Sequence, residues 1–329
     1  MKKSILVVGG AGYIGSHVCK TLDMAGYQPV TLDNLCTGYR DFVKFGPLVE
    51  AHVSDSAAVA ETVAKYSIEA VIDLAGSIEV GESVIDPLKY YENNFACKLE
   101  FLQTLSKAGI KAFVFSSTAA VYGEPEIVPI PESHVKNPKN PYGWSKRLFE
   151  QLLADFHLAG GPAWMALRYF NAAGASFDGD IGESHEPESH LIPRACFAAM
   201  GKTPPLDVYG NDYPTPDGTA IRDYVHVMDL ASAHILAFEA LLSGKPPAAY
   251  NLGNGIGNSI QDILASFTKL GHPVPHNFKP RRAGDPARLV ADNTAACKEL
   301  GFKPRYGDID SIISSAYSWH EKKFELNAK

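Results

Sequence analysis

The stretch Gly9-Gly10-Ala11-Gly12-Tyr13-Ile14-Gly15 (GGAGYIG) decides the fold class of this chain. It follows the apolar run Ile5–Val8 and opens a helical pattern over Gly15–Ala25, so it joins a predicted strand to a predicted helix. Glycines allow a tight turn and let the backbone approach a pyrophosphate, which then lies at the positive end of the helix. We therefore predict a dinucleotide-binding turn in which the cofactor contacts Gly9, Gly12 and Gly15.

An acidic residue closes the next predicted strand. Asp33 follows the apolar run Pro29–Leu32 and lies 18 residues beyond Gly15. A carboxylate there accepts hydrogen bonds from the adenosine ribose hydroxyls and repels a 2′-phosphate. The cofactor predicted from this spacing is NAD rather than NADP.

Short apolar runs alternate with longer helical patterns through the first half of the chain. Continuous apolar runs are typical of strands buried on both faces, and their alternation with helices predicts a parallel sheet. We expect strands at Ile5–Val8, Pro29–Leu32, Ala70–Leu74, Ala112–Phe115 and Trp164–Leu167. We expect helices at Gly15–Ala25, Ala57–Lys65, Leu88–Lys107 and Tyr142–His157. The predicted fold class is α/β, a doubly wound parallel (Rossmann) sheet with a smaller α/β substrate lobe.

The sequence pattern changes after Arg168, because residues 171–220 are rich in Gly, Pro, Asp and Ser. We expect later helices at Leu191–Met200, Asp229–Leu242, Ile260–Leu270 and Ile309–Phe324, with a strand at Tyr250–Leu252 and a loop at Gly271–Pro286. This pattern predicts an NAD-binding domain at residues 1–172 and an interleaved nucleotide-sugar lobe at 173–329. Elements near 220–252 are expected to return to the first domain.

The composition excludes several classes of protein. The 329 residues are 46% hydrophobic and 20% charged, and the formal net charge is −7. Because dense basic runs are lacking, we expect no nucleic-acid partner, and because no run of about 18 apolar residues occurs, we expect no membrane span. The five cysteines lie far apart without a Cys-x-x-Cys pair, which favours a reducing, cytoplasmic location.

A tyrosine and a lysine four residues apart indicate proton chemistry. Tyr142 and Lys146 share one helical face, and Thr118 follows a predicted strand. A free tyrosine, with a pKa of about 10, is a poor base at neutral pH. We expect the Lys146 ammonium and an oxidised nicotinamide to lower the pKa of Tyr142, with the Thr118 hydroxyl completing the proton path.

Two histidines at His185 and His190 superficially suggest a metal site. They are five apart with Pro187 between them, so they do not form the H-E-x-x-H pattern of a zinc helix. We predict a polar substrate loop and no metal there.

Several segments carry a close resemblance to a known family. They are GGAGYIGSH (9–17), LDNLC (32–36), VGES (80–83), YYENN (90–94), RYFNAAG (168–174), YGNDYP (209–214), IRDYVHVMDL (221–230), NLG (251–253) and PRRAGD (280–285). Together with the Thr/Tyr/Lys set they resemble the UDP-glucose 4-epimerase family of extended short-chain dehydrogenases/reductases, over nearly the whole chain.

The resemblance implies two sets of contacts. NAD would contact Tyr13, Ile14, Asp33, Asn34, Leu74, Asn93, Tyr142, Lys146 and Phe170. The UDP-sugar would contact Asn171, His190, Leu191, Tyr209, Arg222, Arg282, Asp285 and Leu289. Two arginines suit a diphosphate, an aspartate suits a ribose and a tyrosine suits a uracil face.

The resemblance also implies the reaction, a reversible interconversion of UDP-galactose and UDP-glucose by transient oxidation at C4 with tightly bound NAD. The alternatives are a nucleotide-sugar dehydratase or decarboxylase of the same family, and a non-catalytic sensor of NAD or nucleotide sugar. Ala119 and Ala120 stand where a dehydratase needs an acid and a base, and an intact Thr118, Tyr142 and Lys146 set argues against a sensor.

Some positions depart from the family pattern. His52 and Ile78 replace residues expected beside the cofactor, and Leu289 leaves open whether N-acetylated sugars are accepted. The predicted helices at Leu88–Lys107 and Tyr142–His157 carry apolar residues on more than one side, so we expect a homodimer formed by these helices.

Overall fold

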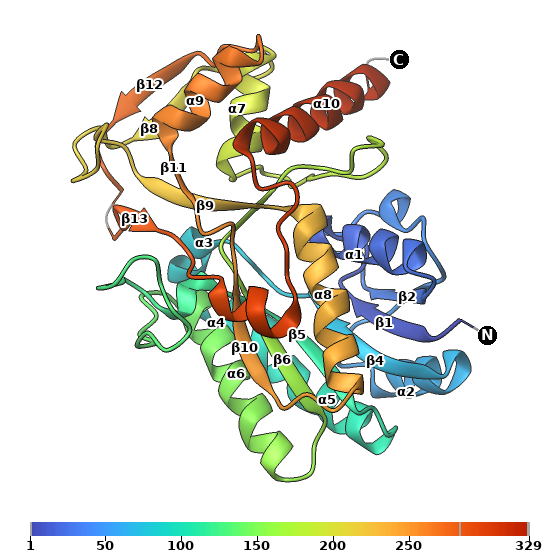
Figure 1. Ribbon diagram of the computed structural model, residues 1–329. Helices are drawn as coiled ribbons and strands as arrows, with labels where there is room; N and C mark the ends of the chain where they lie inside the picture. The colour runs from blue at the N-terminus through green and yellow to red at the C-terminus, as the bar shows by residue number, and fades with distance from the viewer. Residues whose placement is uncertain (1, 283, 328–329) are drawn as a thin grey trace.

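A parallel sheet of seven strands forms the centre of the computed structural model, which describes residues 2–282 and 284–327 (Figure 1). The strand order is β10-β6-β5-β4-β1-β2-β3, and every neighbouring pair is parallel. The strands are β1 (Ser4–Val8), β2 (Gln28–Asp33), β3 (Leu48–Glu50), β4 (Ile68–Asp73), β5 (Ala112–Thr118), β6 (Ala163–Tyr169) and β10 (Ala248–Leu252). The predicted doubly wound parallel sheet is confirmed.

Helices cover both faces of this sheet. One face carries α1 (Tyr13–Met24) and α8 (Val227–Leu242), which lie side by side in Figure 1, together with a π-helical turn at Ala296–Leu300. The other face carries α2 (Ser56–Tyr66), α5 (Cys97–Lys107) and α6 (Pro141–Leu158). Each helix turns an apolar stripe to the sheet, so the strands are buried on both sides.

The smaller lobe lies at the top of Figure 1 and has an apolar core of its own. Its helices are α7 (Leu191–Ala199), α9 (Ile260–Lys269) and α10 (Ile309–Asn327). Its strands are β7 (Asn171–Ala173), β8 (Leu206–Tyr209), β9 (Ile221–His226), β11 (Gly257–Ser259), β12 (His276–Lys279) and β13 (Arg288–Leu289). β9 lies between β11 and β13, and β7 also pairs with β9. α8 and β10 cross back to the large sheet, where β10 pairs with β6. The division at residues 172 and 173 stays a prediction.

One expectation about local structure was wrong, and another was right for a continuous helical run but missed a π-helical turn inside it. The segment Gly271–Pro286, expected to be a loop, contains β12, which pairs with β8. All four β12 residues are exposed, so the strand lacks the apolar alternation that identifies a strand in sequence. The helix expected at Leu88–Lys107 is divided into α4 (Pro87–Tyr91), a π-helical turn (Glu92–Ala96) and α5.

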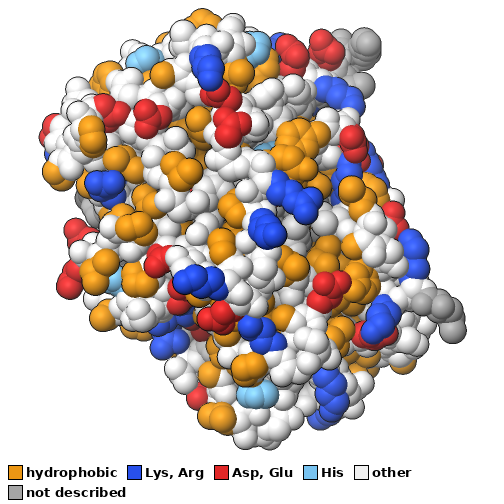
Figure 2. Space-filling model, in the orientation of Figure 1, with side chains coloured by type: hydrophobic (Ala, Val, Ile, Leu, Met, Phe, Trp, Pro, Cys, Tyr) orange, Lys and Arg blue, Asp and Glu red, His pale blue; other side chains and the backbone are white. Residues whose placement is uncertain are grey.

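The distribution of charge on the surface is relevant to the expectation of no nucleic-acid partner. On the face drawn in Figure 2, Lys and Arg side chains are interspersed with Asp and Glu side chains rather than gathered in one patch. Among residues 2–282 and 284–327, none of the helices has the length and apolar character needed to cross a membrane.

Candidate active site

The predicted cofactor and catalytic residues lie at one edge of the large sheet. Parallel strands bring their carboxyl ends together, and ligands of open α/β sheets bind outside those ends. Gly9 follows β1, Leu74 follows β4, Thr118 ends β5 and Phe170 follows β6. Residues spread over about half of the chain therefore meet at this edge.

The glycine turn has no room for side chains. A Cβ atom on Gly15 would lie 2.0 Å from the Gly9 carbonyl oxygen, and one on Gly9 would lie 2.9 Å from the Ala75 backbone nitrogen. Gly9 also has a φ of +77°, which favours glycine. Gly12 is the N-cap of α1, and without a side chain it leaves the first N–H groups of that helix to a ligand.

Asp33 fastens the end of β2 to this turn. Its carboxylate accepts hydrogen bonds from the Ala11 N–H at 3.0 Å and the Leu35 N–H at 2.8 Å. Next to it, the Asn34 side chain accepts a hydrogen bond from the Cys36 N–H at 3.2 Å. A side-chain-free turn at a helix N-terminus, with a carboxylate held beside it, fits NAD.

A buried asparagine that the sequence reasoning missed links the sheet edge to α6. Asn94 is fully buried, and its side chain accepts from the Ser77 N–H at 2.7 Å and donates to the Ser145 hydroxyl at 3.1 Å. The predicted contact Asn93 donates to the Ser77 hydroxyl at 2.9 Å. The only signal in the sequence was the pair of asparagines, and one of them positions the helix that carries Lys146.

The three predicted catalytic residues come together. Asn140 caps α6 by accepting from the Gly143 N–H at 2.8 Å, which starts the helix just before Tyr142. The Thr118 hydroxyl accepts from the Ala120 N–H at 3.1 Å and lies close enough to Tyr142 to lower the pKa of its phenol. The ammonium of Lys146 donates to the Ser116 carbonyl at 2.8 Å.

The ionisation of this group differs from the expectation. Burial raises the pKa of Tyr142, with a further rise from the Glu79 charge, and the Thr118 hydrogen bond opposes both. Burial and then the nearby Lys98 charge lower the pKa of Lys146 to about 7. The expected lowering of the Tyr142 pKa depends on both Lys146 and an oxidised nicotinamide and stays a prediction. Desolvation by the protein acts against the charged forms of both residues.

Lys98 and Asp73 form a buried ion pair that sequence patterns did not indicate. Lys98 Nζ lies 2.6 Å from an Asp73 carboxylate oxygen and also donates to the Ala75 carbonyl at 2.6 Å. Their side chains are 1% and 0% exposed. The partners are 25 residues apart on different elements, so only the fold brings them together.

The predicted sugar-side residues form two polar contacts on the lobe. Arg222 is ion-paired with Asp285, and the Arg282 guanidinium lies 3.9 Å from the centroid of the Tyr209 ring. Leu289 pairs in register with Arg222. The side chain of Leu289 packs in a small apolar cluster with Phe170 near the turn after β5.

The remaining sugar-side residues lie at the two ends of the loop before α7. Asn171 donates to the Asp223 carbonyl at 3.0 Å, His190 is the N-cap of α7 and Leu191 is its first residue. The five-residue spacing was expected to keep the imidazoles of His185 and His190 off a common helical face. The loop nevertheless brings the two rings to 5.2 Å between centroids. A loop can bring two side chains together at a spacing that would separate them on a helix.

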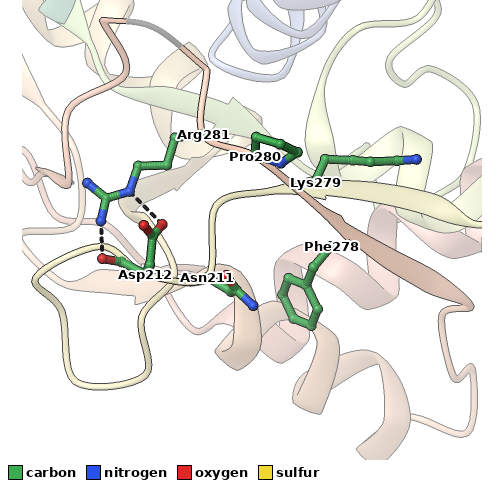
Figure 3. A pocket seen from close by; sticks show the side chains of 6 residues that line it. All are labelled: Asn211, Asp212, Phe278, Lys279, Pro280 and Arg281. Atoms are coloured by element: carbon green, nitrogen blue, oxygen red, sulfur yellow. Dashed lines mark hydrogen bonds and ion pairs between the residues drawn. The ribbon is translucent and has the colours of Figure 1, made fainter.

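One open pocket of about 620 Å³ lies on the lobe where β8 and β12 end (Figure 3). Arg281 turns toward Asp212, with its Nε 2.6 Å from a carboxylate oxygen, while Phe278 and Lys279 extend on the other side. The pocket is lined by none of the predicted site residues, although Arg282 follows it directly in the chain.

Comparisons with known proteins agree with this geometry. Residues 5–253 match the NAD dependent epimerase/dehydratase family, and the chain belongs to that family. It is 49% identical to a UDP-glucose 4-epimerase of Rhizobium leguminosarum bv. trifolii, over 97% of this chain and 98% of that protein. Among curated relatives, it is also 43% identical to the UDP-glucose 4-epimerase of Bacillus subtilis over 96% of each chain.

Solved structures give the same result. UDP-glucose 4-epimerase from Brucella ovis in complex with NAD superposes with a TM-score of 0.94 at 50% identity, covering 96% of this chain and 98% of that one. The enzyme from Stenotrophomonas maltophila, with bound NAD and formylated UDP-arabinopyranose, has a TM-score of 0.96 at 37% identity, covering 98% and 99%. The family predicted from the sequence is confirmed.

Proposed function

We propose that this chain interconverts UDP-galactose and UDP-glucose by transient oxidation at C4 with tightly bound NAD, which makes it an isomerase. The observation that carries the proposal is the meeting of Thr118, Tyr142 and Lys146 at the carboxyl edge of the sheet, next to a turn that fits NAD. The full-length likeness to UDP-glucose 4-epimerases supports the same reaction.

The side chains of the site handle the proton. When bound, NAD supplies reversible hydride acceptance at C4 of the sugar. Tyr142 Oη takes the proton of the sugar 4-hydroxyl and later returns it, so the residue acts as base and acid in turn. The Thr118 hydroxyl lowers the pKa of the Tyr142 phenol. A charged Lys146 ammonium favours the phenolate by the general effect of a nearby positive charge.

The turn after β5 argues against elimination of water. Ala119 and Ala120 occupy a short 3₁₀ turn (Ala119–Val121) directly after Thr118. Neither methyl group can donate or accept a proton, so a dehydratase reaction lacks its acid and base. The side chains present support oxidation and reduction at C4 alone.

The sugar nucleotide is assigned to the lobe residues that face the sheet edge. Arg222 and Arg282 suit the diphosphate, Asp285 the ribose and Tyr209 the uracil. Asn171, His190 and Leu191 complete the set around the start of α7. Arg222 is held by Asp285 and Arg282 covers Tyr209, so both arginines are already placed before a ligand arrives.

We also propose that two copies associate through α4, α5 and α6. Leu88 is 78% exposed, and Trp144 and Leu148 are each 39% exposed, on neighbouring helices. Large apolar side chains on packed helices are typical of a helix-bundle interface. Equilibrium sedimentation of wild-type protein and Leu148→Asp tests this, since a monomer in both would refute it.

We propose a cytoplasmic location, which suits five free cysteines.

The activity is tested with UDP-galactose and no added NAD. Tag-free protein is incubated with the sugar nucleotide, and UDP-glucose is followed by a coupled assay. We expect turnover from the cofactor that purifies with the protein, measured separately after denaturation. Cofactor-loaded protein that forms no UDP-glucose would refute the proposed function.

A further inference from the structure

Four potential metal ligands gather in the loop that precedes α7. They are Glu183, His185, Glu188 and His190, and one donor atom from each lies within 4.8 Å of all the others. The His190 imidazole nitrogen Nδ1 lies 2.6 Å from Glu183 Oε1 and 3.5 Å from Glu188 Oε1. The corresponding nitrogen of His185 lies 3.3 Å from Glu183 Oε1 and 3.6 Å from Glu188 Oε2.

These separations match the size of a tetrahedral metal site. Zinc ligands lie about 2.1 Å from the ion, so neighbouring donors in a regular tetrahedron are about 3.4 Å apart. Three of the four separations above are 3.3–3.6 Å, and the fourth is shorter. A small outward shift of one histidine would therefore admit an ion among the four donors.

The burial of the two carboxylates indicates that the cluster has a purpose beyond ion pairing. The side chains of Glu183 and Glu188 are 4% and 6% exposed. Glu188 Oε2 and His185 Nδ1 face each other, yet neither has a hydrogen-bond partner among the residues that the structure describes. A buried carboxylate oxygen without a hydrogen-bond partner is costly, and a divalent cation would satisfy both atoms.

We propose that this loop binds one divalent transition-metal ion through four side chains: Glu183, His185, Glu188 and His190. Two imidazoles with two carboxylates suit Zn²⁺ and its first-row neighbours, whereas Mg²⁺ and Ca²⁺ prefer oxygen ligands alone. Protons compete with a metal ion for the histidine nitrogens of this cluster, because the two carboxylates raise the pKa of His185 to about 9.

The position of the loop assigns the ion a structural role. The ring of His185 meets the edge of Tyr13, in the dinucleotide turn, at 6.3 Å between centroids. Trp319 of α10 donates to the Glu183 carbonyl at 2.9 Å, and His190 is the residue at the N-terminal boundary of α7. An ion here fastens the segment that lies between the cofactor turn and the helix assigned to the sugar nucleotide.

The test uses tag-free wild-type protein stripped with a chelator and then given one equivalent of Zn²⁺ or Co²⁺. After gel filtration we expect about one ion per chain by elemental analysis, and an intense visible ligand-field band for Co²⁺, as a tetrahedral site requires. The melting temperature should rise on adding Zn²⁺. Loss of the ion on gel filtration, or a weak octahedral Co²⁺ spectrum, would overturn the proposal, and both readouts need no variant.

Variants then locate the site. His185→Gln and Glu188→Gln should each weaken Zn²⁺ binding roughly tenfold or more, since each removes a ligand. His276→Gln and Glu61→Gln, which change exposed residues outside the loop, should bind like wild type. Equal binding in the loop variants and these controls would also overturn the proposal. Because His190 is also assigned to the sugar nucleotide, epimerase activity is measured separately and does not decide the metal proposal.

Discussion

The ammonium groups of Lys98 and Lys146 lie over the same ring, that of Phe115, at 5.7 Å and 5.0 Å from its centroid. Lys98 is ion-paired with Asp73, but the positive charge of Lys98 still helps to lower the pKa of Lys146. The charge of a buried ion pair in the Rossmann core therefore affects the pKa of a residue in the proposed catalytic group. We therefore propose that Lys98 acts through Lys146, as a positioning residue.

The first prediction concerns the charge of Lys98. Lys98→Met removes a positive charge near Lys146, so the pKa of Lys146 should rise above about 7. If activity requires the Lys146 ammonium, the high-pH limb of kcat/KM should then move to higher pH. A pH profile measures this, and an unshifted limb would contradict the role of Lys98.

The same variant should be less stable. Asp73 would be left buried without its partner, which costs about 3–5 kcal/mol. The double variant Lys98→Met/Asp73→Asn should recover part of that loss in urea unfolding. The exposed Lys111→Met serves as the control and should change neither stability nor the pH profile.

The second prediction separates proton transfer from cofactor binding. Tyr142→Phe should lower kcat by about 10²–10⁴-fold, since it removes the acid and base. The NAD content should stay at the wild-type level. Thr118→Ser keeps the hydroxyl and should retain most activity, whereas Thr118→Val should lose more. Wild-type rates in the phenylalanine variant would disprove the assignment.

The third prediction concerns the glycine turn. A methyl group at Gly15 would overlap the Gly9 carbonyl, so Gly15→Ala should lose bound NAD and melt at a lower temperature. Gly81 has open space around its Cβ position, and Gly81→Ala is the matched control that should retain NAD. Cofactor content is measured by absorbance after denaturation. Equal NAD content in the two variants would contradict the packing argument.

The fourth prediction concerns substrate size. Leu289 packs against the same apolar cluster as Phe170 and pairs with Arg222. Leu289→Ser should raise kcat/KM for UDP-N-acetylgalactosamine relative to UDP-galactose by about tenfold, because a smaller side chain admits the acetyl group. An unchanged ratio of the two kcat/KM values would show that other residues set the space.

Local patterns in the sequence were enough to predict the strand–turn–helix unit, the parallel sheet and the helix that carries Tyr142 and Lys146. These features depend on residues close in the chain: glycines where a Cβ cannot fit, apolar runs that need two covered faces, and a four-residue helical spacing. The exposed strand β12 escaped prediction because its side chains carry no burial pattern.

Only the tertiary structure decided which distant groups meet and how they ionise. It joined Lys98 to Asp73, linked Asn94 to Ser145, and folded the 183–190 loop so that two histidines and two glutamates converge. It also showed that burial raises the pKa of Tyr142, against the lowering expected from Lys146 and NAD. Burial and long-range charge are properties of the packed chain, because desolvation and Coulomb energies depend on distances in space rather than on spacing in sequence.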